Sequence, residues 1–225
     1  PISSFYGYRY VGNVQTGDNV SQLAILGPFN KPGDPLFFNA DASNNNLVIN
    51  ASDRVILGQG LPTLVYGMTN NFSFKGFELS VFVNGVSGNT IYGGPVRNAT
   101  TLTTGNQLGL VRDRWTPTNP SNTVPRANFS GGGANLISSR WIVDGAFWRL
   151  RNVTLAYNLP GKLLGGMKAR SARVYVSGQN LFTQTTYPGY DPEVGSFGQS
   201  NLRQGVDWGS YPPNKIVMVG LNVGF

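Results

Sequence analysis

The 225-residue sequence contains no cysteine and no histidine, and the two absences exclude several kinds of chemistry. Without cysteine the chain forms no disulfide, carries no thiolate nucleophile and offers no sulfur ligand to zinc. Without histidine it lacks the commonest general base and the commonest metal ligand. A disulfide-free bacterial protein located outside the cytoplasm fits this composition.

Charged residues are also scarce. Asp, Glu, Lys and Arg make up only 12% of the chain, about half of the roughly 25% usual in soluble proteins. Thirty glycines, fourteen prolines and 12% aromatic residues accompany this shortage, and Asn, Ser and Thr supply most of the polarity. Such a composition is typical of a β protein with long polar loops.

The net charge of +7 raises the question of an anionic partner. The basic residues are scattered and form only short pairs, such as Arg112/Arg114 and Arg149/Arg151, and no RNA-binding motif is present, so nucleic acid is not an expected partner. No apolar run approaches the roughly 18 residues of a membrane-spanning helix. Because no signal segment begins at Pro1, we expect a mature or partial product.

Five segments alternate apolar and polar residues with a period of two, which predicts β-strands. They are residues 61–74, 75–85, 146–159, 171–182 and the run that starts at Lys215. The first two are nearly contiguous, so a tight turn at Lys75 and Gly76 should join them into an antiparallel hairpin. In the third segment the part around Arg149 and Arg151 does not alternate clearly.

Short and long connections alternate along the chain. Residues 160–170 link two strands closely, whereas 85–145 and 183–213 form long polar connections. A transmembrane β-barrel has this arrangement, with short periplasmic turns and long external loops. We therefore predict an all-β fold, in which the strands belong to an antiparallel transmembrane barrel with one lipid-facing and one lumen-facing side. The alternative is a soluble or surface β-sandwich that acts as a binding module, such as a carbohydrate-binding domain or an adhesin.

The last residues, "VMVGLNVGF", end on an aromatic side chain with no polar tail. Gly220, Val223 and Phe225 resemble the C-terminal signal by which outer-membrane barrels are recognised for insertion. They are candidate assembly residues, and Phe225 is expected at the periplasmic rim.

Several stretches resemble one family, the SusC/RagA-type TonB-linked transporters of the bacterial outer membrane. The stretches are "SDRVILGQGLPTLVYGMTNNFSFKGFELSVFVNGVSGNTIY" (52–92), "FWRLRNVTLAYNLP" (147–160), "ARVYVSGQNLFTQTTYPGYDPEV" (172–194) and the ending "GSYPPNKIVMVGLNVGF". The likeness begins near "SFYGYRYVGNVQTGD" (4–18), covers nearly the whole chain and keeps the family's order.

The resemblance implies the C-terminal segment, residues 1–225, of a single barrel domain of about 22 strands, whose plug and N-terminal strands lie outside this chain. It also implies import of glycans or peptides with energy delivered through TonB, and a SusD-like surface lipoprotein as partner. Lipid, lipopolysaccharide and the remaining barrel strands would be further partners. The C-terminus is expected on the periplasmic side of the outer membrane.

One segment departs from the family, where the region before the "DR" pair often resembles an acidic calcium-binding loop. Here it reads "NADASNNNLVINASDR" (39–54), and Asp41 and Asp53 are its only carboxylates. A hard cation such as Ca²⁺ needs several oxygen ligands with enough negative charge. A polar surface turn is therefore favoured over a weak Ca²⁺ site, and no cofactor is expected.

An enzyme would have to rely on carboxylates, of which Asp191 and Glu193 are the closest pair, and nothing around them in the sequence supplies an acid–base partner. Catalysis is not expected. Aromatic residues of the long loops can stack on sugar rings or can order the loops by packing. The candidate ligand-binding residues are Trp115, Trp141, Tyr187, Tyr190, Asp191, Trp208 and Tyr211.

Overall fold

The computed structural model describes residues 2–41, 47–103, 105–129, 132–165, 169–195 and 202–225. The chain folds into two compact units. The sheet unit comprises residues 62–88, 145–193 and 211–225. The loop-rich unit comprises residues 1–61, 89–144 and 194–210.

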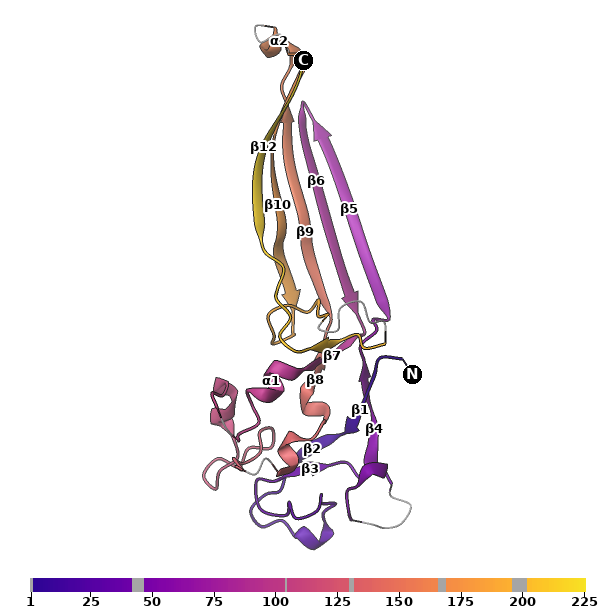
Figure 1. Ribbon diagram of the computed structural model, residues 1–225, viewed down its shortest axis with the longest axis vertical. Coiled ribbons are helices and arrows are strands. Elements are labelled where there is room, and N and C mark those ends of the chain that lie inside the picture. Colours follow the sequence, from indigo (N-terminus) through magenta and orange to yellow (C-terminus); the bar gives the residue numbers. More distant parts are fainter. Residues whose placement is uncertain (1, 42–46, 104, 130–131, 166–168, 196–201) are drawn as a thin grey trace. The chain divides into compact units, whose positions relative to one another are not determined.

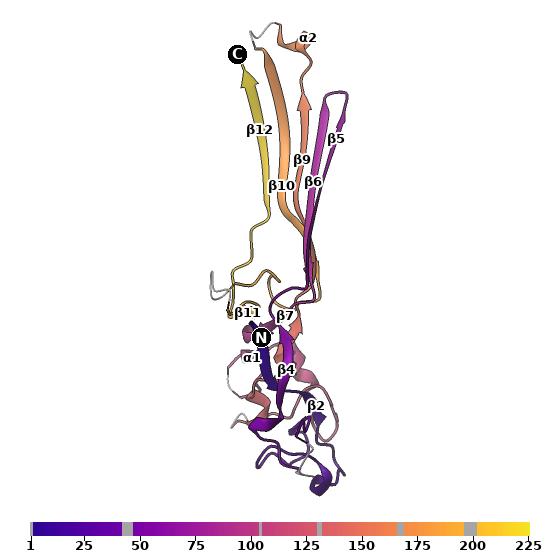
Figure 2. The same ribbon diagram turned by 90° about the vertical axis from the view of Figure 1, so that its right-hand side faces the viewer.

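The sheet unit is built on one antiparallel sheet with the strand order β12-β10-β9-β6-β5 (Figures 1 and 2). Its strands are β5 (Leu64–Phe74), β6 (Phe77–Ser87), β9 (Phe147–Asn158), β10 (Ser171–Thr185) and β12 (Ile216–Gly224). The short helix α2 (Gly161–Leu164) connects β9 to β10. Each long strand pairs with the next long strand along the chain, so the sheet is an up-and-down meander, and the five strands predicted from the sequence are confirmed.

The predicted hairpin between β5 and β6 is also confirmed. Phe74 pairs with Phe77, and the two residues between them have positive φ, 46° at Lys75 and 88° at Gly76. A two-residue turn with both φ values positive matches the right-handed twist of the flanking strands. A Cβ on Gly76 would lie 3.0 Å from the Asn158 carbonyl oxygen, so this position favours glycine for two reasons.

The sheet has an apolar face and a polar face, because side chains alternate along each strand and directly paired residues share a face. The apolar face includes Met68, Phe72, Leu79, Val81, Val153, Leu155, Val174, Val176, Val219 and Leu221. The polar face includes Asn71, Glu78, Ser80, Asn152, Thr154, Arg173, Ser177 and Asn222. Much of the apolar face is exposed in this chain, with Phe72 at 61% and Val219 at 79%. An apolar surface of this kind requires a partner or a lipid environment.

A β-bulge interrupts the alternation in β9 and explains why the sequence pattern was ambiguous there. In β6, Phe82 pairs with Asn152 and the next residue, Val83, pairs with Leu150. Arg151 is thus an extra residue in β9, and such a residue resets which side chains point to which face. The bulge keeps Leu150 on the apolar face.

The bulge continues into β10. Asn152 and Leu150 pair there with Gln179 and Phe182, so two residues of β10 are left over opposite Arg151. One of them, Asn180, has a φ of 51°, a conformation that asparagine tolerates better than most residues.

Short elements held together by side chains form the loop-rich unit. The strand β1 (Ser4–Tyr8) pairs with β4 (Arg54–Gln59), and β2 (Tyr10–Asn13) pairs with β3 (Pro35–Phe37). A third small sheet places β7 (Thr90–Gly93) between β8 (Ile142–Asp144) and β11 (Val206–Asp207). Among the described residues, the helices of this unit include α1 (Gly94–Asn98) and the short 3-10 segments Val20–Gln22, Ala51–Asp53, Gly109–Asp113, Gly132–Asn135 and Ser139–Trp141.

A cluster of apolar side chains forms a core in this unit. Tyr8, Phe37 and Ile49 are buried in it, and Tyr10 and Leu136 pack against them. The long connections that the sequence shows as Gly/Asn/Thr/Pro-rich therefore contain ordered elements.

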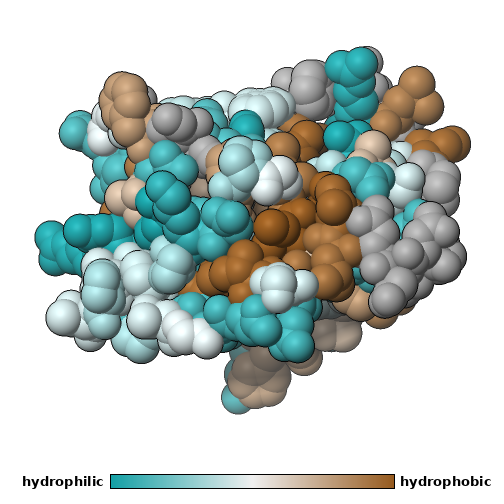
Figure 3. Space-filling view, turned by 90° about the horizontal axis from the view of Figure 1, so that it is seen from below, coloured by the Kyte–Doolittle hydropathy of each residue, from teal (hydrophilic) through white to brown (hydrophobic). Residues whose placement is uncertain are grey.

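Hydrophobic side chains also gather near the middle of the face drawn in Figure 3. In the described residues no helix is long and apolar enough to span a membrane.

Candidate functional site

Four charged residues meet on the polar face at the bulge, and we call them the arginine clamp: Arg149, Arg151, Asp191 and Glu193. Arg149 Nη2 lies 2.6 Å from Asp191 Oδ2, and its Nη1 lies 2.8 Å from Glu193 Oε2. Arg151 Nη2 donates to Glu193 Oε1. The Arg149 side chain is fully buried, and a buried charge requires such partners because its removal from water is costly.

The local sequence favours this arrangement. The two arginines are separated by one residue, and the bulge places Arg149 on the polar face that also carries Asn152. In the acidic segment, Asp191 Oδ1 accepts a hydrogen bond from the backbone N–H of Glu193 at 2.8 Å. This bond forms a local turn, in which both carboxylates point towards β9. The clamp therefore fastens the segment "YDPE" (190–193) to the sheet.

A pocket of about 380 Å³ lies beside the clamp, and we call it the Tyr190 pocket. Its lining residues are Arg149, Asn180, Thr183, Thr185, Tyr190, Asp191, Pro192, Pro212, Pro213 and Lys215. Tyr190 is 83% exposed. The lining thus combines an open aromatic ring with hydroxyl, amide and ammonium groups.

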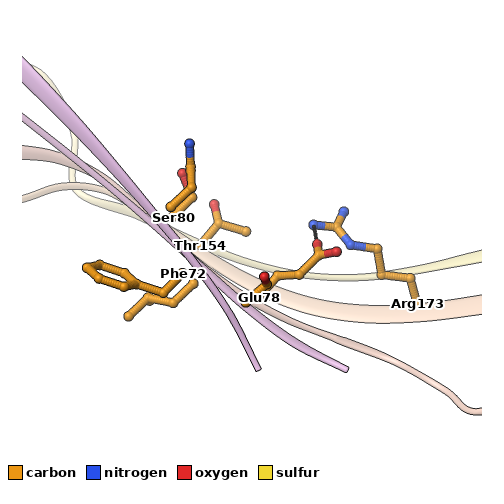
Figure 4. Close-up of a pocket in the computed structure, with 8 residues that line it drawn as sticks. Phe72, Glu78, Ser80, Thr154 and Arg173 are labelled. Carbon is orange, nitrogen blue, oxygen red and sulfur yellow. Dashed lines mark hydrogen bonds and ion pairs between the residues drawn. The ribbon is translucent and has the colours of Figure 1, made fainter. Parts of the chain in front are cut away.

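A second pocket, of about 330 Å³, lies on the polar face towards the hairpin end of the sheet (Figure 4). Arg173 Nη2 lies 3.1 Å from Glu78 Oε2, and Asn158 Nδ2 donates to Glu78 Oε1 at 2.8 Å. Ser80 and Thr154 add hydroxyl groups to its lining. The polar face is therefore a hydrogen-bonded and ion-paired surface along most of its length.

The aromatic residues predicted to bind ligands occupy different environments. Trp115 and Trp141 are buried, and their indole N–H groups donate to Gln15 Oε1 at 3.0 Å and to the Leu136 carbonyl at 3.1 Å. Tyr187 is also buried. These three side chains order the structure around them, which is the packing use of loop aromatics.

The remaining predicted aromatic residues are accessible. Trp208 is half-exposed, with its ring 5.5 Å from that of Tyr92 in an edge-on arrangement. Tyr190 and Tyr211 are more than four-fifths exposed, and of these two only Tyr190 lines the Tyr190 pocket.

The sequence identified Asp191 but missed the partners that give it a role. Arg149 and Arg151 were visible as a closely spaced basic pair, and Asp191 and Glu193 as a closely spaced acidic pair. Each pair has two charged residues separated by one residue, and the two pairs have opposite charge. This similarity was the signal that could have predicted their contact. The arginines keep both carboxylates in ion pairs, which gives no support to an acid–base role.

The candidate cation residues lie in a turn of the loop-rich unit. Asp53 is buried, and its Oδ1 accepts the backbone N–H groups of Ala40 and Asp41 at 2.9 and 3.1 Å. Its Oδ2 accepts the N–H of Asn50 at 2.8 Å. In the described residues no group of three or more potential metal-ligating acidic side chains occurs. The carboxylate of Asp53 therefore serves to order the turn, and the Ca²⁺ question stays at the level of a sequence prediction.

The candidate assembly residues lie at the end of β12. Gly220 pairs with Tyr175, and a Cβ on Gly220 would lie 2.2 Å from the Tyr175 ring. The tyrosine ring thus occupies the space above the glycine on the polar face. Val223 pairs with Ala172 on the apolar face, and Phe225 is 80% exposed.

The loop-rich unit contains one perturbed tyrosine. Burial raises the pKa of Tyr10 to about 12, and this effect outweighs the opposing influence of the nearby Arg140 charge. Burial also lowers the pKa of Arg140. The Tyr10 hydroxyl donates to Asn13 Oδ1 at 2.8 Å, so its neutral form is part of the packed structure.

Comparison with known proteins gives clear relatives, although no family model matches the chain. The chain is 36% identical over 232 residues to TonB-dependent receptor P3 of Formosa agariphila, covering 100% of this chain and 22% of that protein. It is 32% identical to TonB-dependent receptor P26 of the same organism, covering 100% of this chain and 23% of that protein. TonB-dependent receptor SusC of Bacteroides thetaiotaomicron is 27% identical over 183 residues, which are 81% of this chain and 17% of SusC.

The solved structures agree on the fold. The RagAB peptide importer in its open-open state matches with a TM-score of 0.75 and 23% identity, over 99% of this chain and 22% of that chain. Its closed-closed state matches with a TM-score of 0.70 and 22% identity, over 99% of this chain and 23% of that chain. The chain spans about a fifth of the length of the curated relatives it matches. From the sheet, its two faces and these relatives, we conclude that the chain belongs to the SusC/RagA-type TonB-dependent outer-membrane barrel proteins, of which it is a C-terminal part.

Proposed function

We propose that the chain supplies strands and surface loops to an outer-membrane transporter that imports glycans or peptides with energy delivered through TonB. The observation that carries this proposal is the two-faced sheet. Side chains of its apolar face, such as Phe72 and Val219, are exposed, while its polar face is lined by ion pairs and hydrogen bonds. A barrel wall needs these two faces, one towards lipid and one towards an aqueous lumen.

The remaining barrel strands are proposed partners of this sheet. The strand order ends at β5 and β12, so each of them has one edge without a partner strand among the described residues. An unpaired edge does not persist in the hydrocarbon layer, because its backbone groups would have no hydrogen-bond partner. Lipid and lipopolysaccharide would contact the apolar face.

A SusD-like surface lipoprotein is the proposed outer partner, and TonB would act through parts of the protein outside this chain. Support comes from the similarity to SusC and to RagAB, the latter described as a peptide importer. Asp191 and Glu193 are held in ion pairs by the clamp, which gives no support to an acid–base role for them.

Deletion of the full-length gene in its native bacterium tests the function. Labelled oligosaccharides and oligopeptides are offered to wild-type, deletion and complemented cells, and the same measurement is made in a strain lacking TonB. TonB-dependent accumulation of either class, lost on deletion and restored by complementation, is the expected result. A full-length protein that fractionates without detergent would instead support the soluble binding module.

The orientation of the barrel is tested separately. We propose that residues 85–145 and 183–213 lie outside the cell and that residues 160–170 and the C-terminus face the periplasm. Because the chain lacks cysteine, Asn119→Cys and Lys162→Cys can each be labelled with an impermeant maleimide on intact cells. Both side chains are exposed in this chain. Labelling of Asn119→Cys alone is expected, and labelling of Lys162→Cys alone would reverse the orientation.

A further inference from the structure

The lining of the Tyr190 pocket has the chemistry of a sugar-binding site. The lining includes the exposed Tyr190 and the hydroxyl groups of Thr183 and Thr185. Sugar rings have apolar C–H faces and polar rims, so they suit a site with an aromatic platform and a few convergent polar groups. The pocket volume of about 380 Å³ is within the range of small-molecule sites.

The charges of the pocket favour an acidic ligand. Arg149 and Asp191 both line it, but they neutralise each other through the clamp. Lys215 also lines it, and no carboxylate of the described residues lies within ion-pair distance of its ammonium group. The charge left for a ligand is therefore positive.

Two buried polar atoms of lining residues have no hydrogen-bond partner among the described residues. They are Arg149 Nε, a donor on a fully buried side chain, and Asn180 Oδ1, an acceptor. Buried polar atoms are nearly always hydrogen-bonded. The lining residues thus include an unpaired donor and an unpaired acceptor, which are groups of the kind that hydroxyls pair with.

The pocket is held in shape by contacts of its own lining residues. The clamp fastens the segment that carries Tyr190, and Asn180 Nδ2 donates to the Asn214 carbonyl at 3.0 Å. That bond ties the β10 bulge to the residue next to Lys215. A site organised before binding loses less conformational entropy when its ligand arrives.

The same residues fit a peptide less well. A peptide ligand brings an ammonium terminus and apolar side chains, yet both nearby carboxylates are already paired with arginines. The lining contains three prolines but no aliphatic side chain of the Val, Leu or Ile type.

From these observations we propose that the Tyr190 pocket binds a uronic-acid-type sugar of the imported cargo, with Tyr190 against the ring and Lys215 at the carboxylate. This inference rests on the proposed transport function and specifies its substrate class.

Binding to the full-length protein in detergent tests the proposal. Isothermal titration calorimetry is run with a panel of uronate oligosaccharides, with neutral maltooligosaccharides of the same length, and with tripeptides. We expect the wild type to prefer a uronate oligosaccharide, and Lys215→Gln to weaken that binding about two- to fivefold and remove the preference. The effect of Lys215→Gln should shrink in high salt. Tyr190→Ala should weaken binding of both sugar classes about tenfold.

Matched controls are Lys162→Gln and Phe129→Ala, because both residues are exposed and neither lines the pocket. Neither control should change affinity. Unaltered uronate binding in both Tyr190→Ala and Lys215→Gln would overturn the site, and binding of tripeptides in place of uronates would overturn the substrate class. Parallel uptake assays distinguish these failures from failure of the proposed function, since TonB-dependent uptake of another cargo would continue in wild-type cells.

Discussion

At the scale of single residues, Arg149 is the side chain on which the clamp depends. It is fully buried and holds two carboxylates, whereas Arg151 is about one-third exposed and holds one. Removal of one member of a buried ion pair leaves an uncompensated charge, which costs about 3–5 kcal/mol. Loss of a partly exposed pair costs about 0–1 kcal/mol.

We therefore expect Arg149→Met to destabilise the full-length barrel by about 3 kcal/mol and Arg151→Met by less than about 1 kcal/mol. The measurement is denaturant unfolding in detergent, followed by the loss of heat-modifiable mobility on gels. The double change Asp191→Asn with Glu193→Gln in the Arg149→Met background should recover part of the loss, because it removes the stranded charges. Equal effects of Arg149→Met and Arg151→Met would show that the clamp is not organised around the buried arginine.

Tyr10 gives a pH-dependent prediction. Its pKa in the folded protein is about 12, above the ordinary value of 10.0. A raised pKa means that the folded state disfavours the ionised form, so the stabilising contribution is fully present below pH 10 and is lost as the pH rises towards 12. The free energy of unfolding of the loop-rich unit should fall across this interval.

Tyr10→Phe supplies the comparison, because phenylalanine cannot ionise. The variant should be less stable than the wild type at pH 8, where it lacks the hydrogen bond to Asn13, and its stability should fall less between pH 10 and 12. Unfolding curves of full-length wild type and variant over this interval measure the difference. If the stability of the two proteins fell equally between pH 10 and 12, the fold would not raise the pKa of Tyr10.

At the scale of elements, the sequence was informative where alternation is regular. The strand predicted at 146–159 is observed at Phe147–Asn158, and the one predicted from Lys215 is observed at Ile216–Gly224. Period-two alternation is strong evidence for a strand with two different environments. The sequence did not predict the short strands and helices between β6 and β9, because those elements depend on side-chain packing and not on regular alternation.

The clamp shows why the candidate site was only partly predictable. Arg151 occupies a bulge, and a single inserted residue moves the following side chains to the other face. Strict alternation therefore could not place Arg149 and Asn152 on one face. The contact between Arg149 and Asp191 spans 42 positions in the sequence, a separation that no local pattern encodes.

The two faces of β12 lead to a test with neighbouring residues. Val219 lies on the apolar face and Met218 on the polar face, opposite Ser177. Arginine at a lipid-facing position near the membrane midplane costs about 2–4 kcal/mol, whereas a position facing the lumen tolerates it. Val219→Arg should thus reduce the folded, membrane-inserted fraction far more than Met218→Arg, as measured by heat-modifiability of outer-membrane fractions. The reverse order of damage would mean that the faces are assigned the wrong way round.

At the scale of the whole molecule, the chain ends on a strand whose role differs between the two architectures considered. In a barrel, β12 must pair with a strand from the remainder of the protein, because closure removes the two open edges of the sheet. In a soluble sandwich, the exposed Phe225 is a dispensable end. The register of β12 against β10 is regular from Ile216 to Gly224, so the strand itself is well formed.

Deletion of residues 223–225 from the full-length protein separates these possibilities. The deletion removes Val223 from the apolar face and the aromatic terminus proposed as the assembly signal, while all ion pairs of the polar face remain. Synthesis should be unchanged, but the amount of heat-modifiable protein in the outer membrane should fall sharply. Phe225→Asp should have the same effect more weakly, since it changes the terminus without shortening the strand.

Asn119→Asp is a suitable control, because it alters an exposed position of the loop-rich unit and leaves β12 intact. It should insert at the wild-type level. The position of Gly220 provides an independent check, because a Cβ there would collide with the Tyr175 ring. Gly220→Val should therefore lower insertion by disturbing the β10–β12 pairing, even with Phe225 present. Wild-type insertion of the truncated protein in folded form would exclude Phe225 as an assembly signal and leave strand pairing as the determinant.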